Sequence, residues 1–317
     1  MEHYVAFLGG LIGLVFFADQ FVKGASLVAK IYRVSPLVVG VVVLGFGTSL
    51  PESLVSITAA YAGDLEIGTG NIIGSNVANL TLVMASAVML KEISSIAMPT
   101  FDDVLRKEGI ITLGATAALA YVFWSGESVS RIEGLFLLGA GIIVLLFILK
   151  NISSPDLVST EEADGGAKRE IFRAVFGLTG TVVGAYFTVK GADGLAKSWG
   201  ISGGFVGYLL IAIGTSLPEL VTTAACAKRG EVEMIIGNLF GSNIFNCLLV
   251  GGLMGAVGPG SISDSNLTGS ALILMLGITL AMLGLAYKGK SLDRKDGLGL
   301  LLIYVGAAIF LGINSTT

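Results

Sequence analysis

Long apolar runs follow one another along almost the whole chain, with short polar stretches between them. A run of about twenty apolar residues is long enough to cross a bilayer as a helix. The short alternating segments typical of a membrane β-barrel are absent from the sequence. We therefore expect an all-α polytopic membrane protein with ten transmembrane helices. The predicted spans are residues 4–29, 35–62, 67–90, 109–125, 131–149, 171–196, 202–227, 233–257, 267–287 and 296–314.

Composition and charge agree with this class. Mean hydropathy is +0.86 and 13% of residues are charged, against about 25% in soluble domains. No basic cluster predicts a nucleic-acid partner. Of the 19 lysines and arginines, 15 lie in or beside the odd-numbered loops and two on the opposite side. Cytoplasmic loops accumulate these residues, so we expect a cell-membrane protein with both termini outside. The first apolar run has no signal-peptide features and is predicted to be a retained span.

The chain contains two cysteines and one histidine. Cys226 and Cys247 lie in or beside spans and have no cysteine at the matching positions of the other half. They are expected to be small apolar packing residues rather than a disulfide or a thiolate site. His3 stands at the extreme terminus, which argues against histidine-assisted hydrolysis.

The two halves of the sequence repeat one another. Residues 22–79 align without a gap on residues 189–246, and 24 of these 58 positions are identical. The polar stretch between the halves is typical of a linker. Because each half holds five predicted spans, the second copy would cross the membrane in the opposite orientation. The predicted units are a first repeat (1–150, motif 45–80), a cytoplasmic linker (151–169) and an inverted second repeat (170–317, motif 212–247).

The motif GTSLPE, at 47–52 and 214–219, places a proline and a carboxylate inside two apolar spans. Proline interrupts helical hydrogen bonding, and irregular backbone at this depth is tolerated where it lines a cavity. Residues four apart share a helix face. Four such pairs carry only oxygen ligands: Thr48 with Glu52, Thr215 with Glu219, Ser75 with Asn79, and Ser242 with Asn246. Hard cations such as Ca²⁺ and Na⁺ prefer this ligand set, so the sequence predicts a buried cation site.

Other interpretations remain open at this point. Each serine could instead bond back to its own helix, and Asn79 and Asn246 could join helices. Asp19 and Lys23 are predicted to form a local or interfacial ion pair. Two facing carboxylates could belong to an intramembrane protease, although such enzymes normally use aspartates, and a passive cation channel is also compatible with the composition. The paired broken helices favour a transporter.

The doubled motifs, GTSLPE with GNIIGSNVAN and GTSLPE with GNLFGSNIFN, resemble the two repeats of the calcium/cation antiporter superfamily. The prokaryotic sodium/calcium exchanger branch is the most similar. The resemblance implies a secondary antiporter that needs no cofactor, with Na⁺, Ca²⁺ and the lipid bilayer as partners and a monomer as functional unit. Spans 2, 3, 7 and 8 would form the ion-binding core, and spans 1 and 6 a long pair that slides against it. GTSLPE argues for coupling to Na⁺; H⁺/Ca²⁺ exchange is the alternative.

The resemblance also implies a ligand set. Glu52 and Glu219 would bind Ca²⁺ with backbone oxygens of Thr48 and Thr215, which also border the Na⁺ sites. One Na⁺ site would use Gly45, Ser49, Glu52 and Ser75. Its twin would use Ala212, Ser216, Glu219 and Ser242. Asn79 and Asn246 would line the centre. Potassium-dependent relatives carry aspartate at the position of Asn246, which argues against a K⁺ requirement.

Overall fold

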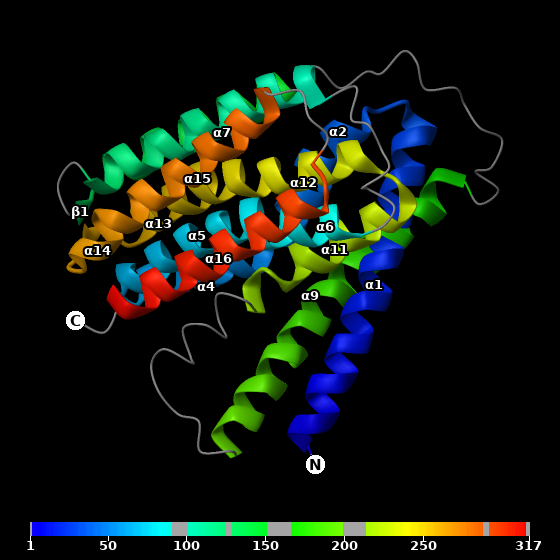
Figure 1. Ribbon diagram of the computed structural model, residues 1–317, viewed down its shortest axis with the longest axis horizontal. Helices are drawn as coiled ribbons and strands as arrows, with labels where there is room; N and C mark the ends of the chain where they lie inside the picture. Colours follow the sequence, from blue (N-terminus) through cyan, green and yellow to red (C-terminus); the bar gives the residue numbers. More distant parts are fainter. Residues whose placement is uncertain are drawn as a thin grey trace.

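The computed structural model describes residues 2–90, 101–124, 128–150, 166–198, 214–287 and 292–314 as a helical bundle (Figure 1). The first half contains α1 (Glu2–Tyr32), α2 (Pro36–Val39), η1 (Gly40–Gly45), α3 (Phe46–Thr48), α4 (Leu50–Tyr61), α5 (Leu65–Ala78), η2 (Asn79–Val83), α6 (Met84–Met89), α7 (Phe101–Trp124), β1 (Ser128–Val129) and α8 (Arg131–Lys150). The second contains α9 (Gly166–Ser198), α11 (Leu217–Arg229), α12 (Val232–Ile244), η3 (Phe245–Val250), α13 (Gly251–Val257), β2 (Gly260–Ser261), α14 (Ser265–Thr268), α15 (Ser270–Tyr287) and α16 (Arg294–Asn314). The elements η1, η2 and η3 are π-helical turns within longer helices.

Within the described residues, six helices are long and apolar enough to cross a membrane, or seven when the bent pair formed by Pro36–Thr48 and Leu50–Tyr61 counts as one span. The count of ten and the inverted relation of the halves stay predictions. Helix α9 begins at Gly166, so the last four residues of the predicted linker 151–169 are helical. Their sequence, GAKR, contains good helix formers that extend the span beyond its apolar part.

Helices α1 and α9 form a long antiparallel pair. At about 1.5 Å per residue, their 31 and 33 residues make each longer than the hydrocarbon core, so each helix either tilts or extends beyond the core. Glycines of α9 lie directly on the backbone of α1: Gly177 faces Phe21, Gly184 faces Leu14, and Gly191 faces Phe7. Residue numbers rise along one helix as they fall along the other, which establishes the antiparallel order. In Figure 1 the pair leans away from the remaining helices.

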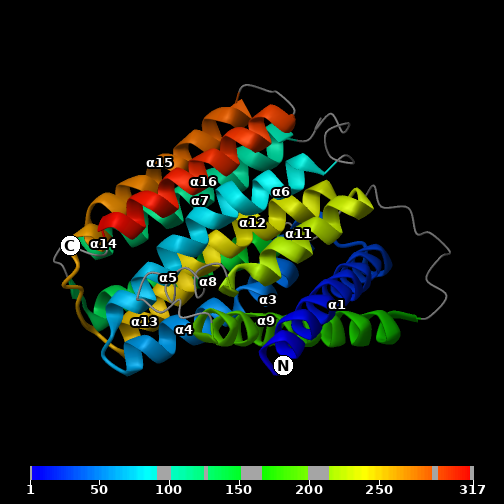
Figure 2. The ribbon, with the colours of Figure 1, turned by 60° about the horizontal axis from the view of Figure 1, so that its bottom comes forward.

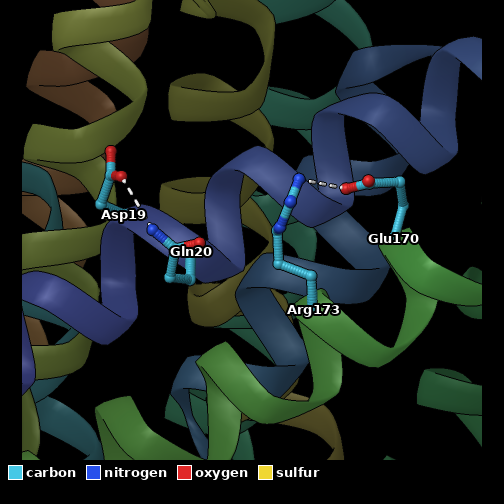
Figure 3. Close-up of polar contacts among 4 residues, drawn as sticks. All are labelled: Asp19, Gln20, Glu170 and Arg173. Atoms are coloured by element: carbon cyan, nitrogen blue, oxygen red, sulfur yellow. Dashed lines mark hydrogen bonds and ion pairs between the residues drawn. The ribbon is translucent and has the colours of Figure 1, made fainter. Parts of the chain in front are cut away.

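Polar contacts gather toward one end of this pair. Figure 3 shows the ion pair between Arg173 and Glu170 of α9 and the contact between Gln20 and Asp19 of α1. Asp19 was expected to pair with Lys23, but its carboxylate lies 2.6 Å from the guanidinium of Arg229, at the end of α11. The prediction of an Asp19–Lys23 pair was wrong, because α11 packs against α1 and brings the guanidinium of Arg229 to the carboxylate of Asp19.

The remaining helices surround a central polar layer. Helix α4 packs on α5 and α11 packs on α12, while α7, α15 and α16 lie on the side away from α1 and α9 (Figure 2) and α8 packs against α13. The described polar side chains that are fully buried concentrate on α4, α5, η2, α11, α12 and η3. Strands β1 and β2, which the hydrophobic pattern does not predict, pair antiparallel through two residues each. This arrangement places the GTSLPE and GN motifs of both halves at the centre of the bundle.

Candidate cation site

Both GTSLPE motifs break their helix in the same backbone conformation. Ser49 has φ −82° and ψ 11°, and Ser216 has φ −84° and ψ 2°. In the first half, the segments on either side of Ser49 meet at 46°. Pro51 occupies the first turn of α4 and has no N–H to donate to the preceding turn. The predicted interruption at residues 45–52 is therefore confirmed, and it starts a new helix immediately before Glu52.

A second irregularity lies beside each break. Asn79 begins the π-helical turn η2, and Asn246 is the second residue of η3. Such turns are rare and occur often at functional sites. The sequence does not predict them, because periodicity cannot distinguish one wide turn from an ordinary helical turn. Both asparagines therefore stand where the helix is locally widened, and both are fully buried.

The two carboxylates lie in this buried layer. One oxygen of Glu219 accepts a hydrogen bond of 3.0 Å from the Ser49 hydroxyl, and one oxygen of Glu52 accepts a bond of 3.4 Å from Ser75. Among the described residues, the only other buried charged side chain is Glu170, which pairs with Arg173. The cluster therefore carries two acidic groups and no basic group from the described part of the chain.

Besides the hydroxyls of Thr69 and Thr222, four carboxylate and amide oxygens in this layer have no hydrogen-bond partner among the described residues. They are Oε2 of Glu52, Oε2 of Glu219, Oδ1 of Asn79 and Oδ1 of Asn246. An unpaired buried acceptor costs about 1–3 kcal/mol, and more when it is charged. Cations bound in this layer would give such oxygens the partner that the described residues do not supply. Oxygen-only ligands fit Na⁺ and Ca²⁺, so these residues fit the predicted site.

Hydrogen bonds cross between the halves in mirrored pairs. Thr48 donates to Asn238 at 3.3 Å, and its counterpart Thr215 donates to Asn71 at 3.2 Å. Asn71 also donates to Ser56, and Asn238 donates to Thr223, each at 3.0 Å. Neither Asn71 nor Asn238 was among the predicted site residues. Their recurrence in the repeated GN motif was the signal that could have found them.

The predicted ligands belong to one interleaved network. Ser49 bonds to the carboxylate of the other half, Ser216 donates to Ser75 at 3.4 Å, and Ser242 donates to the Gly45 carbonyl at 3.1 Å. Ala212 lies outside the described residues. The division of these groups into separate Na⁺ and Ca²⁺ sites therefore stays a prediction. Cys226 and Cys247 are buried free cysteines.

Comparison with known proteins identifies the family. Residues 2–150 and 170–312 match the model of the sodium/calcium exchanger protein family. The chain belongs to the sodium/calcium exchanger family. The putative antiporter CaxA of Alkalimonas amylolytica is 34% identical over 94% of this chain and 95% of its own. The sodium/calcium exchanger MaX1 of Methanosarcina acetivorans is 33% identical over 97% and 98% of the two chains.

Solved structures agree with this membership. A structure of the sodium-calcium exchanger NCX_Mj, soaked with Na⁺ and Ca²⁺, superposes with a TM-score of 0.84 at 31% identity, covering 98% of both chains. These relatives are exchangers and not enzymes, so the intramembrane-protease alternative is set aside. Family membership and the shared fold support cation/Ca²⁺ antiport by a multi-pass membrane protein.

Proposed function

We propose that the protein exchanges Na⁺ for Ca²⁺ across the cell membrane by alternating access. The observation that carries the proposal is the set of four unpartnered oxygens on Glu52, Glu219, Asn79 and Asn246. Two acidic groups and two amide oxygens are buried in a layer that holds no basic side chain among the described residues. Na⁺ and Ca²⁺ are transported substrates here, and no cofactor takes part.

Coupling to Na⁺ is favoured over coupling to H⁺. The ligands other than the two acids are hydroxyls and amides, which bind a dehydrated Na⁺ well but do not exchange protons at ordinary pH. The relative MaX1 is itself a sodium/calcium exchanger. H⁺/Ca²⁺ exchange is the second candidate, since Glu52 and Glu219 could carry protons.

From the charges of the site and of the transported ions, we expect the exchange to be electrogenic and independent of K⁺. One Ca²⁺ would neutralise the two carboxylates, whereas three Na⁺, the number that the family resemblance suggests, would leave the core at about +1. Moving one net charge through 100 mV changes the free energy by about 2.3 kcal/mol. This shifts the equilibrium ratio of the transported ions roughly fiftyfold. Asn246 contributes no charge, so K⁺ has no added acid to neutralise.

The arrangement of the halves supports alternating access. Helices α1 and α9 are counterparts in the sequence repeat, whose offset is 167 residues. They pack antiparallel, as counterparts in inverted repeats would. We propose ten spans, with the α1–α9 pair moving against the core and the monomer as the functional unit. The lysines and arginines place α1's Lys30 end in the cytoplasm and both termini outside.

The proposal is tested by ⁴⁵Ca²⁺ uptake into liposomes that contain the purified protein. We expect uptake to follow an outward Na⁺ gradient, to respond to voltages clamped with valinomycin, and to persist when total K⁺ is varied at constant voltage. Uptake driven by a pH gradient without Na⁺ would favour H⁺/Ca²⁺ exchange. Uptake indifferent to voltage would refute the charge count, and a requirement for K⁺ as substrate would refute the role of Asn246.

A further inference from the structure

Each asparagine with an unpartnered oxygen is held by another asparagine from the opposite half. The side-chain nitrogen Nδ2 of Asn79 donates to Oδ1 of Asn243 at 3.0 Å. In the mirrored contact, Nδ2 of Asn246 donates to Oδ1 of Asn76 at 3.2 Å. All four side chains are at most 1% exposed. The repeat offset of 167 relates the two contacts, so the same bond is built twice.

These bonds decide which end of each amide is left without a partner in the buried layer. An asparagine side chain has a donor end, NH₂, and an acceptor end, C=O. The donor end would repel a cation, and the acceptor end would bind one. Because Asn243 engages the donor end of Asn79, the oxygen of Asn79 remains unpartnered among the described residues. The same holds for Asn246 and its partner Asn76.

The two holding asparagines are themselves anchored, but differently. Nδ2 of Asn243 donates to the backbone carbonyl of Asn76 at 3.2 Å. Nδ2 of Asn76 lies 2.9 Å from Sγ of Cys247 and 3.6 Å from Sδ of Met275. Sulfur is a weak acceptor compared with a carbonyl oxygen. Asn243 is therefore held more firmly than Asn76, and Asn79 more firmly than Asn246.

We propose that Asn76 and Asn243 are positioning residues that set cation affinity by aiming the oxygens of Asn246 and Asn79. The proposal rests on the proposed antiport and deepens it. Neither residue has an unpartnered oxygen in the cluster, since the Oδ1 of each accepts from a partner amide. Loss of either contact frees the partner amide to rotate its donor end toward the cation.

A double-mutant cycle separates this role from simple packing. Asn243→Leu, Asn79→Leu and the double variant are purified and compared by equilibrium binding of ⁴⁵Ca²⁺ and by Na⁺-driven uptake. We expect each single variant to weaken Ca²⁺ binding and raise the Ca²⁺ KM by about tenfold, with the maximal rate changed less than threefold. The double variant should match Asn79→Leu within twofold, because Asn243 acts through Asn79.

The matched control is Thr279→Val, which removes a buried hydroxyl that bonds only to its own helix at the carbonyl of Met275. It should leave Ca²⁺ affinity unchanged. Cys247→Val, which removes one sulfur acceptor of Asn76, should weaken binding twofold to threefold. If Asn243→Leu does not fold, Asn243→Ala enters the same cycle, and the Cys247 variant tests the other half.

Additive effects in the cycle would overturn the positioning role, as would a fall in maximal rate with unchanged Ca²⁺ binding. Failure of the proposed function has a different signature. In that case the unmodified protein itself would show no Na⁺-driven Ca²⁺ uptake. An unmodified protein that transports, together with an additive cycle, would refute the positioning role alone.

Discussion

The central layer and the α1–α9 pair are built on opposite principles. In the most apolar stretches of Leu65–Met89 and Val232–Val257, 78% and 72% of residues are buried. The corresponding figures for Glu2–Tyr32 and Gly166–Ala192 are 28% and 33%. The central helices are therefore enclosed by protein, whereas most of the pair's surface is not covered by the rest of the chain.

The interfaces differ in the same way. Directional hydrogen bonds such as Thr48–Asn238 and Asn79–Asn243 join the two halves in the central layer. The pair is joined by glycine-to-backbone contacts, as at Gly177 and Phe21, a packing mode common in membrane helices. Directional bonds fix ligand positions, whereas smooth close packing holds two helices together as one unit. This difference fits the proposal that the central layer holds the ion ligands in place and that α1 and α9 move together against it.

The largest expected effect comes from removing charge at the centre. Glu52→Gln or Glu219→Gln should lower Na⁺-driven ⁴⁵Ca²⁺ uptake by at least about 100-fold, because a neutral amide cannot offset a divalent charge in a dry site. The matched control is Glu170→Gln, another buried acid, which lies on α9 beside Arg173. Its uptake should stay within about threefold of the original. Equal losses in all three variants would contradict the special role of the central acids.

The central layer was more predictable than the connections between elements. The repeat and the GTSLPE motifs located the helix breaks and the buried acids, since proline and charge inside an apolar span require a local cause. The π turns at Asn79 and Asn246 and the contact between Asp19 and Arg229 were not predicted. The ion pair depends on which helices pack together, and a single wide turn does not alter the hydrophobic periodicity, so the hydropathy of one chain reveals neither.

A side chain inside the pair should have the next largest effect. A Cβ at Gly177 would collide with the backbone of Phe21, whereas one at Gly139 of α8 would meet nothing within 4 Å. Gly177→Val should therefore separate α1 from α9. We expect it to lower the thermal stability and to reduce the transport rate by about tenfold or more. Gly139→Val is the matched control and should leave both near their original values. Normal transport in the Gly177 variant would show that close packing of the pair is dispensable.

Adding charge at the centre should have an intermediate effect. Asn246→Asp would give the layer a third acid, which attracts a divalent cation more strongly than a monovalent one. Ca²⁺ KM should fall severalfold at high pH, where the new carboxyl is ionised. At low pH the group takes up a proton and the difference should disappear. Asn246→Leu, which adds no charge, should raise KM without this added pH dependence; identical pH profiles for the two variants would contradict the prediction.

The smallest expected effect concerns the contact between the two regions. Arg229 of α11 and Asp19 of α1 form an ion pair whose side chains are 30% and 45% exposed. Exposed pairs contribute only about 0–1 kcal/mol and are screened by salt. Asp19→Asn and Arg229→Gln should therefore change thermal stability little and uptake rate by less than about threefold. The double variant should resemble either single variant, and the exchange of charges in Asp19→Arg with Arg229→Asp should restore the original rate.

If the α1–α9 pair moves against the centre, the contact between Asp19 and Arg229 would stabilise one position of the pair. Both single variants should then shift the uptake rate in the same direction. In 1 M salt the unmodified protein should have the same rate as the variants. Additive single effects that salt does not change would show that Asp19 and Arg229 act independently, and that this contact does not link the two regions.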